Sequence, residues 1–245
     1  MPAIQLKKLT KHYKGVMAVD HLEFSVKNGE FFALLGENGA GKTTLISMLC
    51  GLLSPDGGDA FVLGHSILTD LDKVKPNMNM SPQETAIAPN LTVRENLEFI
   101  AGIYGMSQKE AKIRTSDMLE LFHLKEKEKA KAKTLSGGMQ RRLSIAMGMI
   151  TNPQIYFLDE PTLGLDVRSR RELWKNLEKL KGNMTIILTT HYLEEAEALA
   201  DRICILEKGS LKALGTAEEL KQQTHTTTFE EAFLAICDEE AGIYA

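Results

Sequence analysis

The sequence predicts an α/β protein built around a mostly parallel central sheet. Three short runs carry this prediction: residues 31–36, 154–160 and 185–191. Each is a mainly apolar stretch that ends in a glycine or a polar residue, as expected for a strand buried on both faces. Helical patterns separate the three runs, and strands that alternate with helices favour a parallel sheet covered on both sides.

The first quarter of the chain predicts a separate antiparallel β portion. Residues 3–35 have the pattern of short strands with turns between them. A helix is expected over residues 42–53 and a further strand over residues 60–64. Between these two, Ser54–Asp59 combines a proline with two glycines, which predicts a turn.

From Gln83 the pattern becomes helical. Residues 91–105 and 107–124 have helical spacing, and few strand signals occur before residue 154. We interpret this stretch as a helical insertion in the α/β core.

The second half of the chain continues the alternation of helices and strands. Residues 202–215 predict a hairpin that turns at Lys208-Gly209, and a polar break follows it. Helices are expected at 168–181 and 192–200, and the hairpin covers 202–215. The polar break is 224–228, and a short helical tail is expected at 229–236.

Composition narrows the class of protein. The 245 residues are 43% apolar and 25% charged, which is ordinary for a globular chain, and the net charge is −4. No basic run stands out, so we expect no nucleic-acid partner. Three widely spaced cysteines suit a reducing compartment. With no signal peptide and no long apolar run, we expect a soluble, cytoplasmic protein that another chain would have to bring to a membrane.

Gly36–Thr43 reads GENGAGKT and matches the phosphate-loop pattern G-x-x-x-x-G-K-[ST]. Glycines let successive backbone N–H groups converge on a phosphate, and the following helix adds its positive end. Lys42 supplies a charge toward the β- and γ-phosphates, and the Thr43 hydroxyl can ligate Mg²⁺. A chance match in a chain of this length is on the order of one in a hundred. The motif makes the predicted fold an α/β P-loop NTPase.

Two acidic residues end the second buried run, at Asp159 and Glu160. In doubly wound sheets, ligands bind at the carboxyl ends of the strands. Asp159 is therefore expected to hold Mg²⁺ beside Thr43, and Glu160 to polarise an attacking water. Alone, the pair could equally be surface acids before a proline turn; the phosphate loop favours the functional interpretation.

A second anion site is predicted at LSGGMQ, Leu135–Gln140. Ser136 is a candidate N-cap for the apolar helix that follows, and Gly137 and Gly138 leave backbone N–H groups exposed. This site and the phosphate loop are expected to lie in different subdomains, so one chain alone does not easily bring them onto one nucleotide.

With these motifs in this order, the chain resembles the ATP-binding subunits of ABC transporters over about residues 3–224. The resemblance implies further roles: Tyr13 stacks on adenine, Gln83 contacts Mg²⁺ and water, and His191 contacts the γ-phosphate. It also implies that Leu163–Asp166 crosses between subunits. The nucleotide contacts it implies are Tyr13, Gly36, Glu37, Asn38, Gly39, Ala40, Gly41, Lys42, Thr43, Thr44, Ser136, Gly137, Gly138, Gln140 and Asp166.

In that family two nucleotide-binding domains dimerise head to tail, so that Ser136 and Gly138 of one subunit close over ATP held by Gly36–Thr44 of the other. One copy of each motif then implies a homodimer, or a heterodimer with a similar subunit. The domain expected is 1–224, with a core of 1–82 and 152–224, a helical subdomain of 83–151 and a tail of 225–245.

The resemblance implies ATP hydrolysis with Mg²⁺, in which Glu160, His191, Lys42 and Gln83 act on the reaction. It also implies a separate transmembrane permease, on whose cytoplasmic face the chain sits. The segments 91–105, 188–203 and 228–236 are similar to the drug, antibiotic and sodium exporter subgroup. One alternative stays open, a soluble ATPase of the same type, for example in cluster assembly. A nucleotide-binding regulator without turnover is disfavoured, because Glu160 and His191 are both present. One departure is the polar NMNMSPQ before Gln83, where the family usually has an apolar strand.

Overall fold

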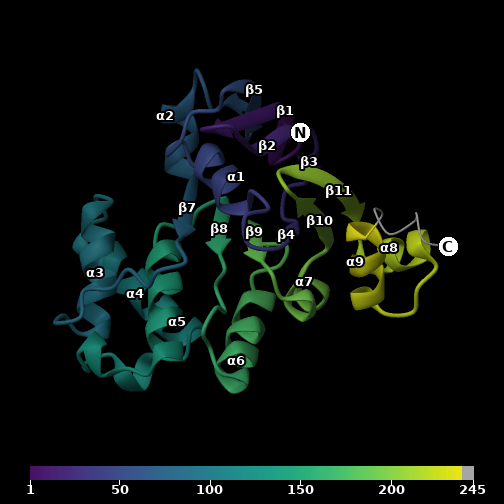
Figure 1. The fold of residues 1–245 in the computed structure, drawn as a ribbon. Coiled ribbons are helices and arrows are strands. Elements are labelled where there is room, and N and C mark those ends of the chain that lie inside the picture. Colours follow the sequence, from purple (N-terminus) through teal and green to yellow (C-terminus); the bar gives the residue numbers. More distant parts are fainter. Residues whose placement is uncertain (239–245) are drawn as a thin grey trace.

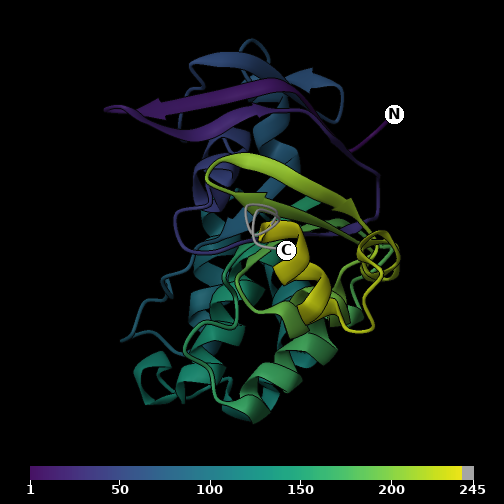
Figure 2. The same ribbon diagram turned by 45° about the vertical axis from the view of Figure 1, so that its right-hand side comes forward.

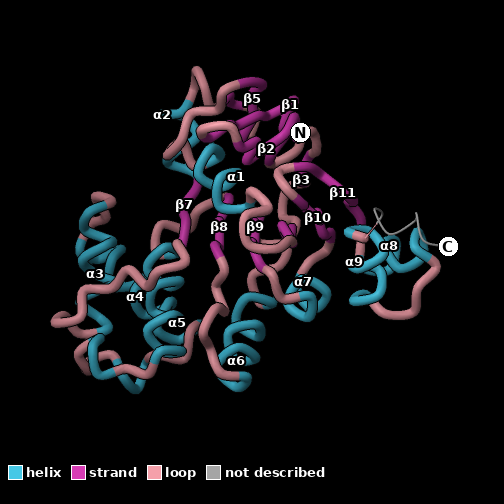
Figure 3. Tube along the Cα trace, viewed as in Figure 1, coloured by secondary structure: helices cyan, strands magenta, loops and turns pink. Residues whose placement is uncertain are grey.

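The computed structural model describes residues 1–238. It holds two sheets, with helices gathered mainly at one side of the larger sheet and around the C-terminal end (Figures 1 and 3). The expected α/β class, with an antiparallel portion at the N-terminal end, is confirmed.

The larger sheet has six strands in the order β11-β10-β4-β9-β8-β7. All neighbours are parallel except β10 and β11, which form the expected hairpin. The three runs that predicted the sheet are β4, β8 and β9, and every residue of these strands is buried. The bounds are β4 Phe31–Leu35, β7 Met78–Ser81, β8 Ile155–Asp159, β9 Thr185–Thr190, β10 Arg202–Glu207 and β11 Ser210–Gly215.

The smaller sheet is antiparallel and lies above the phosphate-loop helix in Figure 1. Its strands are β1 Ile4–Tyr13, β2 Val16–Leu22, β3 Ser25–Val26, β5 Gly57–Val62 and β6 His65–Ser66. β5 starts at Gly57, inside the stretch predicted as a turn, because Gly57 pairs with Thr10 of β1. The turn is therefore shorter than the sequence indicated.

Strand β7 forms although its sequence is polar. It pairs in parallel with β8 only, at the edge of the sheet. Met78 and Ser81 are buried, while Asn79 is half-buried and its amide donates to the Tyr104 hydroxyl at 3.3 Å. An edge strand has one partner and one open side, so polar side chains are tolerated there.

The helical stretch contains α3 Val93–Ile103, α4 Gln108–Leu121 and α5 Gly137–Met149. Thr92 and Ser107 begin the first two with complete capping boxes. The three helices pack together beside β7 and β8 (Figure 1). How the chain divides into subdomains at residues 82 and 152 stays a prediction. The shorter segments are α1 Lys42–Leu49, α2 Leu71–Val74, and 3-10 turns at Lys75–Asn77, Lys125–Lys127 and Ala132–Thr134.

Four helices follow β8: α6 Val167–Glu178, α7 Leu193–Leu199, α8 Ala217–Thr224 and α9 Phe229–Cys237. Helix α8 was not predicted, although Thr216 and Glu219 form a capping box at its start. The expected tail helix is α9, which lies beside the β10–β11 hairpin in Figure 2. The rest of the predicted tail, 239–245, lies outside the described residues.

Apolar side chains fill both faces of the six-stranded sheet. One cluster joins it to α1 and the antiparallel sheet, and another joins it to α5, α6 and the helical stretch. A third groups Phe229 of α9 with Ala33 and Leu35 of β4 in one apolar cluster. The core thus holds the carboxyl ends of β4, β8 and β9 in fixed positions, at one edge of the sheet. Across residues 1–238, every helix is too short or too polar to span a bilayer.

Candidate functional site

The phosphate loop connects β4 to α1, as the motif requires. Gly41 has a φ of 99°, and a Cβ there would lie 2.2 Å from the Ala18 carbonyl oxygen. Only glycine fits this position, because it combines left-handed backbone with a close approach to β2. The loop is anchored further by the Gly209 N–H, which donates to the Ala40 carbonyl at 3.1 Å. Its backbone is therefore held open for an anion.

Lys42 is buried at the first position of α1. Its ammonium donates to the carbonyl oxygens of Gly36 at 2.6 Å and Glu37 at 2.9 Å. Burial lowers the pKa of Lys42, and the charges of Glu160 and Asp159 oppose that shift. The ammonium is thus folded back over the loop, with acidic neighbours that favour its charged form.

Asp159 and Thr43 meet across the end of the sheet. The Thr43 hydroxyl donates to Asp159 Oδ1 at 3.3 Å, and Thr189 of β9 donates to the same oxygen at 2.5 Å. A carboxylate oxygen and a hydroxyl so close together are the hard oxygen donors that Mg²⁺ prefers. Asp159 is 4% exposed, so these contacts fix its orientation.

Glu160 occupies an unusual backbone position directly after β8. Its φ is 43°, which is left-handed and uncommon for such a residue. Its N–H donates to the Thr189 carbonyl at 3.1 Å and to the Thr189 hydroxyl at 2.9 Å. The carboxylate lies 3.8 Å from Lys42 Nζ and 3.3 Å from His191 Nδ1. The turn thus directs an acid between two basic groups.

His191 follows β9, and its ring packs against Tyr192 with the centroids 4.2 Å apart. Although Nδ1 lies 3.3 Å from Glu160 Oε2, the two atoms are not aligned for a hydrogen bond, and Nδ1 has no partner in the described chain. A buried ring nitrogen without a partner is available to a ligand. Nδ1 of His191 therefore remains a candidate for contact with a substrate oxygen.

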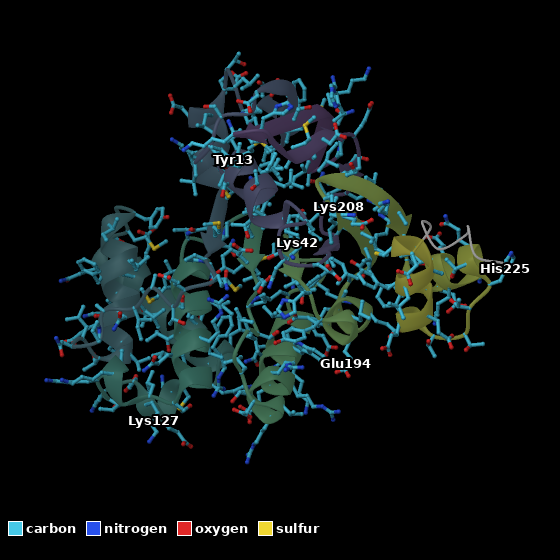
Figure 4. All side chains as sticks on the ribbon, in the orientation of Figure 1. Tyr13, Lys42, Lys127, Glu194, Lys208 and His225 are labelled. Atoms are coloured by element: carbon cyan, nitrogen blue, oxygen red, sulfur yellow. The ribbon has the colours of Figure 1, made fainter. Side chains whose placement is uncertain are left out.

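These groups surround one cavity of about 400 Å³. Figure 4 places Lys42 near the middle of the molecule, between the antiparallel sheet and the helices. Ala18 was not expected in the lining, because an alanine carries no chemical signal, and Leu163 was implied only as part of the segment that crosses between subunits. The full lining is Ala18, Asn38, Gly39, Gly41, Lys42, Thr43, Thr44, Gln83, Glu160, Leu163 and His191.

Nine residues implied as nucleotide contacts lie outside this lining, and four of them are Tyr13 and three residues of the phosphate loop. Gly36, Glu37 and Ala40 belong to the loop but do not line the cavity, and Glu37 and Ala40 line a separate pocket. Tyr13 ends β1, is 45% exposed, and lies in the same hairpin as Ala18. Its ring is open to solvent, with the Lys11 ammonium 5.8 Å from the ring centre.

The second predicted anion site is also outside the cavity. Ser136 is the N-cap of α5, and its hydroxyl accepts from the Met139 N–H at 3.4 Å. Gly137 faces open space, whereas a Cβ on Gly138 would lie 2.5 Å from the Ser169 hydroxyl of α6. Gln140 donates instead to the carbonyls of Ala132 and Leu135.

Asp166, the last residue implied as a nucleotide contact, is the N-cap of α6. Its carboxylate accepts from the N–H groups of Arg168 and Ser169, both at 3.0 Å, and from the Ser169 hydroxyl at 2.7 Å. The Ser169 hydrogen bonds lower the pKa of Asp166. Within the chain Asp166 therefore caps the start of α6, a structural role that the sequence resemblance did not imply.

Comparison with known proteins agrees with this geometry. The family model for the ABC transporter matches residues 19–163. The chain is 42% identical over 218 residues to the linearmycin resistance ATP-binding protein LnrL of Bacillus subtilis, covering 89% of the chain and 70% of LnrL. It is also 42% identical to the daunorubicin/doxorubicin resistance ATP-binding protein DrrA of Streptomyces peucetius, covering 89% and 67%.

Two solved structures share the fold. One is the ATP-binding subunit of an ABC transporter, with a TM-score of 0.84, 28% identity and coverage of 96% of this chain and 99% of the other. The second is a dimeric ATP-binding cassette in a post-hydrolysis state, bound to ADP and phosphate, with a TM-score of 0.77, 28% identity and coverage of 87% and 98%. The P-loop NTPase class is thereby confirmed. The chain belongs to the ABC transporter family and is an ATP-binding ATPase of that family.

Proposed function

We propose that the chain hydrolyses ATP at its cavity, as half of a head-to-tail homodimer that powers a separate membrane-spanning partner in export. The observation that carries the proposal is the convergence of Lys42, Glu160, His191 and Gln83, from four separate segments, on one cavity beside the Thr43–Asp159 pair. Such a set fits phosphoryl transfer to water, in which positioning and electrostatics do most of the catalysis.

In this proposal Glu160 polarises the attacking water. It lines the cavity, its backbone is held by Thr189 through its own N–H, and its carboxylate lies near Lys42 and His191. Lys42 and His191 lie on either side of that carboxylate and stabilise negative charge on the transferred phosphoryl group. No covalent intermediate is needed, because water is the nucleophile.

Mg²⁺ fits the oxygen donors at the end of β8. Thr43, Asp159 and Gln83 would hold it, with phosphate oxygens and waters as the other ligands. When bound, Mg²⁺ neutralises charge on the phosphates. Residues 1–238 hold no cluster of three or more histidine, cysteine or acidic side chains suited to a metal, so the site would depend on the nucleotide for its remaining ligands.

The dimer follows from two half-sites that one chain keeps apart. Ser136 and Gly137 present a capped, open helix start, yet neither lines the cavity that contains Lys42. In a twofold arrangement each copy supplies what the other lacks. Both half-sites on this chain are intact, so two identical copies suffice. Leu163 and Val167, which are 39% and 66% exposed, would be covered in that arrangement.

A membrane-spanning partner is supported by exposed apolar residues on α3. Phe99, Ile103 and Tyr104 are 56%, 63% and 55% exposed, and a groove beside them is lined by Met80, Ile100 and Tyr104 among others. Apolar side chains gathered on one surface mark interaction sites. The groove begins next to Gln83, since Pro82 also lines it. Export is proposed because LnrL and DrrA are named as resistance proteins.

Co-purification tests the proposed partner. The Glu160→Gln variant would be tagged, extracted gently from membranes with ATP and Mg²⁺, and its associated chains identified. We expect a multi-spanning membrane protein in roughly equal amount. Adding Phe99→Glu should abolish co-purification of the membrane protein, whereas adding Ile113→Glu should preserve it. Ile113 is 54% exposed, but it lies on α4 and does not line the groove. Recovery of soluble partners only, with the chain absent from membranes, would favour a soluble ATPase.

A further inference from the structure

Arg141 is an arginine buried in the second turn of α5, only 4% exposed. Among residues 1–238 it forms no ion pair; its three side-chain nitrogens donate instead to main-chain carbonyl oxygens. Nε donates to Pro161 at 2.8 Å, and Nη2 to Asp159 at 3.0 Å. Nη1 donates to Pro82 at 2.5 Å and to Gln83 at 3.3 Å.

Such a residue is not what a stable core requires. A buried charge without an ionic partner costs free energy, and an apolar side chain of similar volume is often as stable or more so. What the guanidinium adds is geometry: a rigid planar fork that fixes several acceptors relative to one another. The carbonyl groups that the guanidinium binds therefore indicate which segments it positions.

Two of those acceptors lie on either side of Glu160. The carbonyls of Asp159 and Pro161 belong to the residues before and after it, and Glu160 itself has the left-handed φ of 43°. A backbone in this region persists only where its surroundings hold it. The guanidinium binds both ends of this strained turn at once.

The other two acceptors begin the loop that carries Gln83, after β7. Arg141 itself stands five residues after Ser136, on the helix whose start is the second anion site. One side chain thus connects three segments: the start of α5, the turn of Glu160 and the loop of Gln83. Gln83 lies 58 residues from Arg141 along the sequence, and Asp159 lies 18 residues from it.

We propose that Arg141 is a positioning residue that couples the orientation of α5 to the geometry of Glu160 and Gln83. Movement of the α5 start toward a nucleotide would then be transmitted through the guanidinium to the two residues that act on the attacking water. The inference rests on the roles proposed above for Glu160 and Gln83. Arg141 does not line the cavity, so it acts through them rather than on the substrate.

Arg142 is a matched control on the same helix. It is also buried, at 9% exposed, but it donates to the Phe122 carbonyl and pairs with Glu172 at 3.5 Å. Its contacts are with α4 and α6 rather than with the site. The same change at both positions removes a buried arginine from α5, but only the change at Arg141 releases the Glu160 turn.

The test compares Arg141→Gln and Arg141→Lys with Arg142→Gln in the full chain. ATP turnover, KM, nucleotide affinity of the monomer and melting temperature would be measured. For Arg141→Gln we expect kcat to fall about 10–100-fold, since small misplacements of catalytic groups cost this much, with nucleotide affinity within about threefold. Arg142→Gln should lower the melting temperature to a similar extent and keep kcat within about threefold.

Lysine distinguishes geometry from charge. Arg141→Lys keeps the charge but has a single donor point that cannot reach carbonyls on three sides. It should therefore fold and still show the low kcat. In the Gln83→Ala protein, adding Arg141→Gln should lower kcat by a smaller factor than it does in the wild-type chain. The reason is that Arg141 is proposed to act partly through Gln83.

Three results would overturn the inference: wild-type kcat in Arg141→Gln, full recovery in Arg141→Lys, or equal kcat losses at Arg141 and Arg142. Failure of the proposed function would look different. If Glu160→Gln turned over ATP at the wild-type rate, the assignment of Glu160 would be wrong whatever Arg141 did. If Glu160→Gln abolished turnover while the Arg141 variants did not, only the positioning role would fall.

Discussion

We proposed both the cavity and the start of α5 as anion sites, but only the cavity brings together charged side chains from several segments of the described chain. The cavity gathers side chains from β2, the phosphate loop, the segments that follow β8 and β9, and the Gln83 loop, and Lys42 among them is buried. The α5 start has a satisfied N-cap and an open Gly137, and neither Ser136 nor Gly137 lines the cavity. The difference teaches that the residues of the cavity are already assembled within one chain, whereas the proposed role of the α5 start depends on a second copy.

The largest expected effect is on turnover at the cavity. Glu160→Gln keeps the size and the N–H contacts of the residue but removes its ability to accept a proton. We expect ATP turnover to fall about 10²–10⁴-fold, the usual contribution of a positioned general base. Nucleotide binding should persist. Phosphate release would be measured alongside binding of a fluorescent ATP analogue, and near wild-type turnover would refute the general-base role.

The next effect separates the two regions directly. Lys42→Ala should weaken ATP binding to the monomer about 10–100-fold, the cost of a lost charge-assisted contact. Gly137→Glu should leave monomer binding within about threefold, because Gly137 faces open space and a glutamate suits a helix start. Both variants should lose turnover. Equal losses of monomer affinity, measured by titration calorimetry, would contradict the separation.

A smaller effect concerns stability behind the cavity. Glu195 of α7 is fully buried, and its carboxylate accepts from Trp174 Nε1 at 3.0 Å. Burial raises the pKa of Glu195 above its usual value of 4.5. A carboxyl with a raised folded-state pKa contributes stability below its unfolded pKa, and that contribution is lost as pH rises through the folded value.

The wild-type chain should therefore lose stability relative to Glu195→Gln as the pH rises above the usual glutamate pKa of 4.5. Gln keeps an oxygen for Trp174 but does not titrate. Glu194→Gln is the control, since Glu194 is the exposed neighbour on the same turn and should leave the pH dependence unchanged. Calorimetry would measure the melting temperatures of these proteins across this pH range. A melting-temperature difference between wild type and Glu195→Gln that stays constant with pH would contradict the prediction.

The sequence predicted well the parts that depend on local pattern. The apolar runs of β4, β8 and β9, the phosphate loop and the Ser136 cap are all visible in short stretches. The polar strand β7 was harder, because its pairing with β8 decides its structure. Helix α8 was missed even though Thr216 and Glu219 signalled its start.

Arg141 could not be predicted as a contact of the site. Its four acceptors are backbone atoms, which carry no residue signal, and the three segments that it connects meet only in the folded chain. Gln140 shows the converse, because a residue implied by resemblance makes local hydrogen bonds within the monomer. Whether it contacts a nucleotide in a dimer stays a prediction.

The most direct test is the mass of the Glu160→Gln chain in solution, with and without ATP, beside the double variant Glu160→Gln/Gly137→Glu. Sedimentation or light scattering would give that mass, after both proteins are shown to bind ATP equally. We expect the single variant to dimerise only with ATP, and the double variant to stay monomeric. Equal behaviour of the two, as monomers or as dimers, would contradict the claim that the α5 start of one copy completes the cavity of the other.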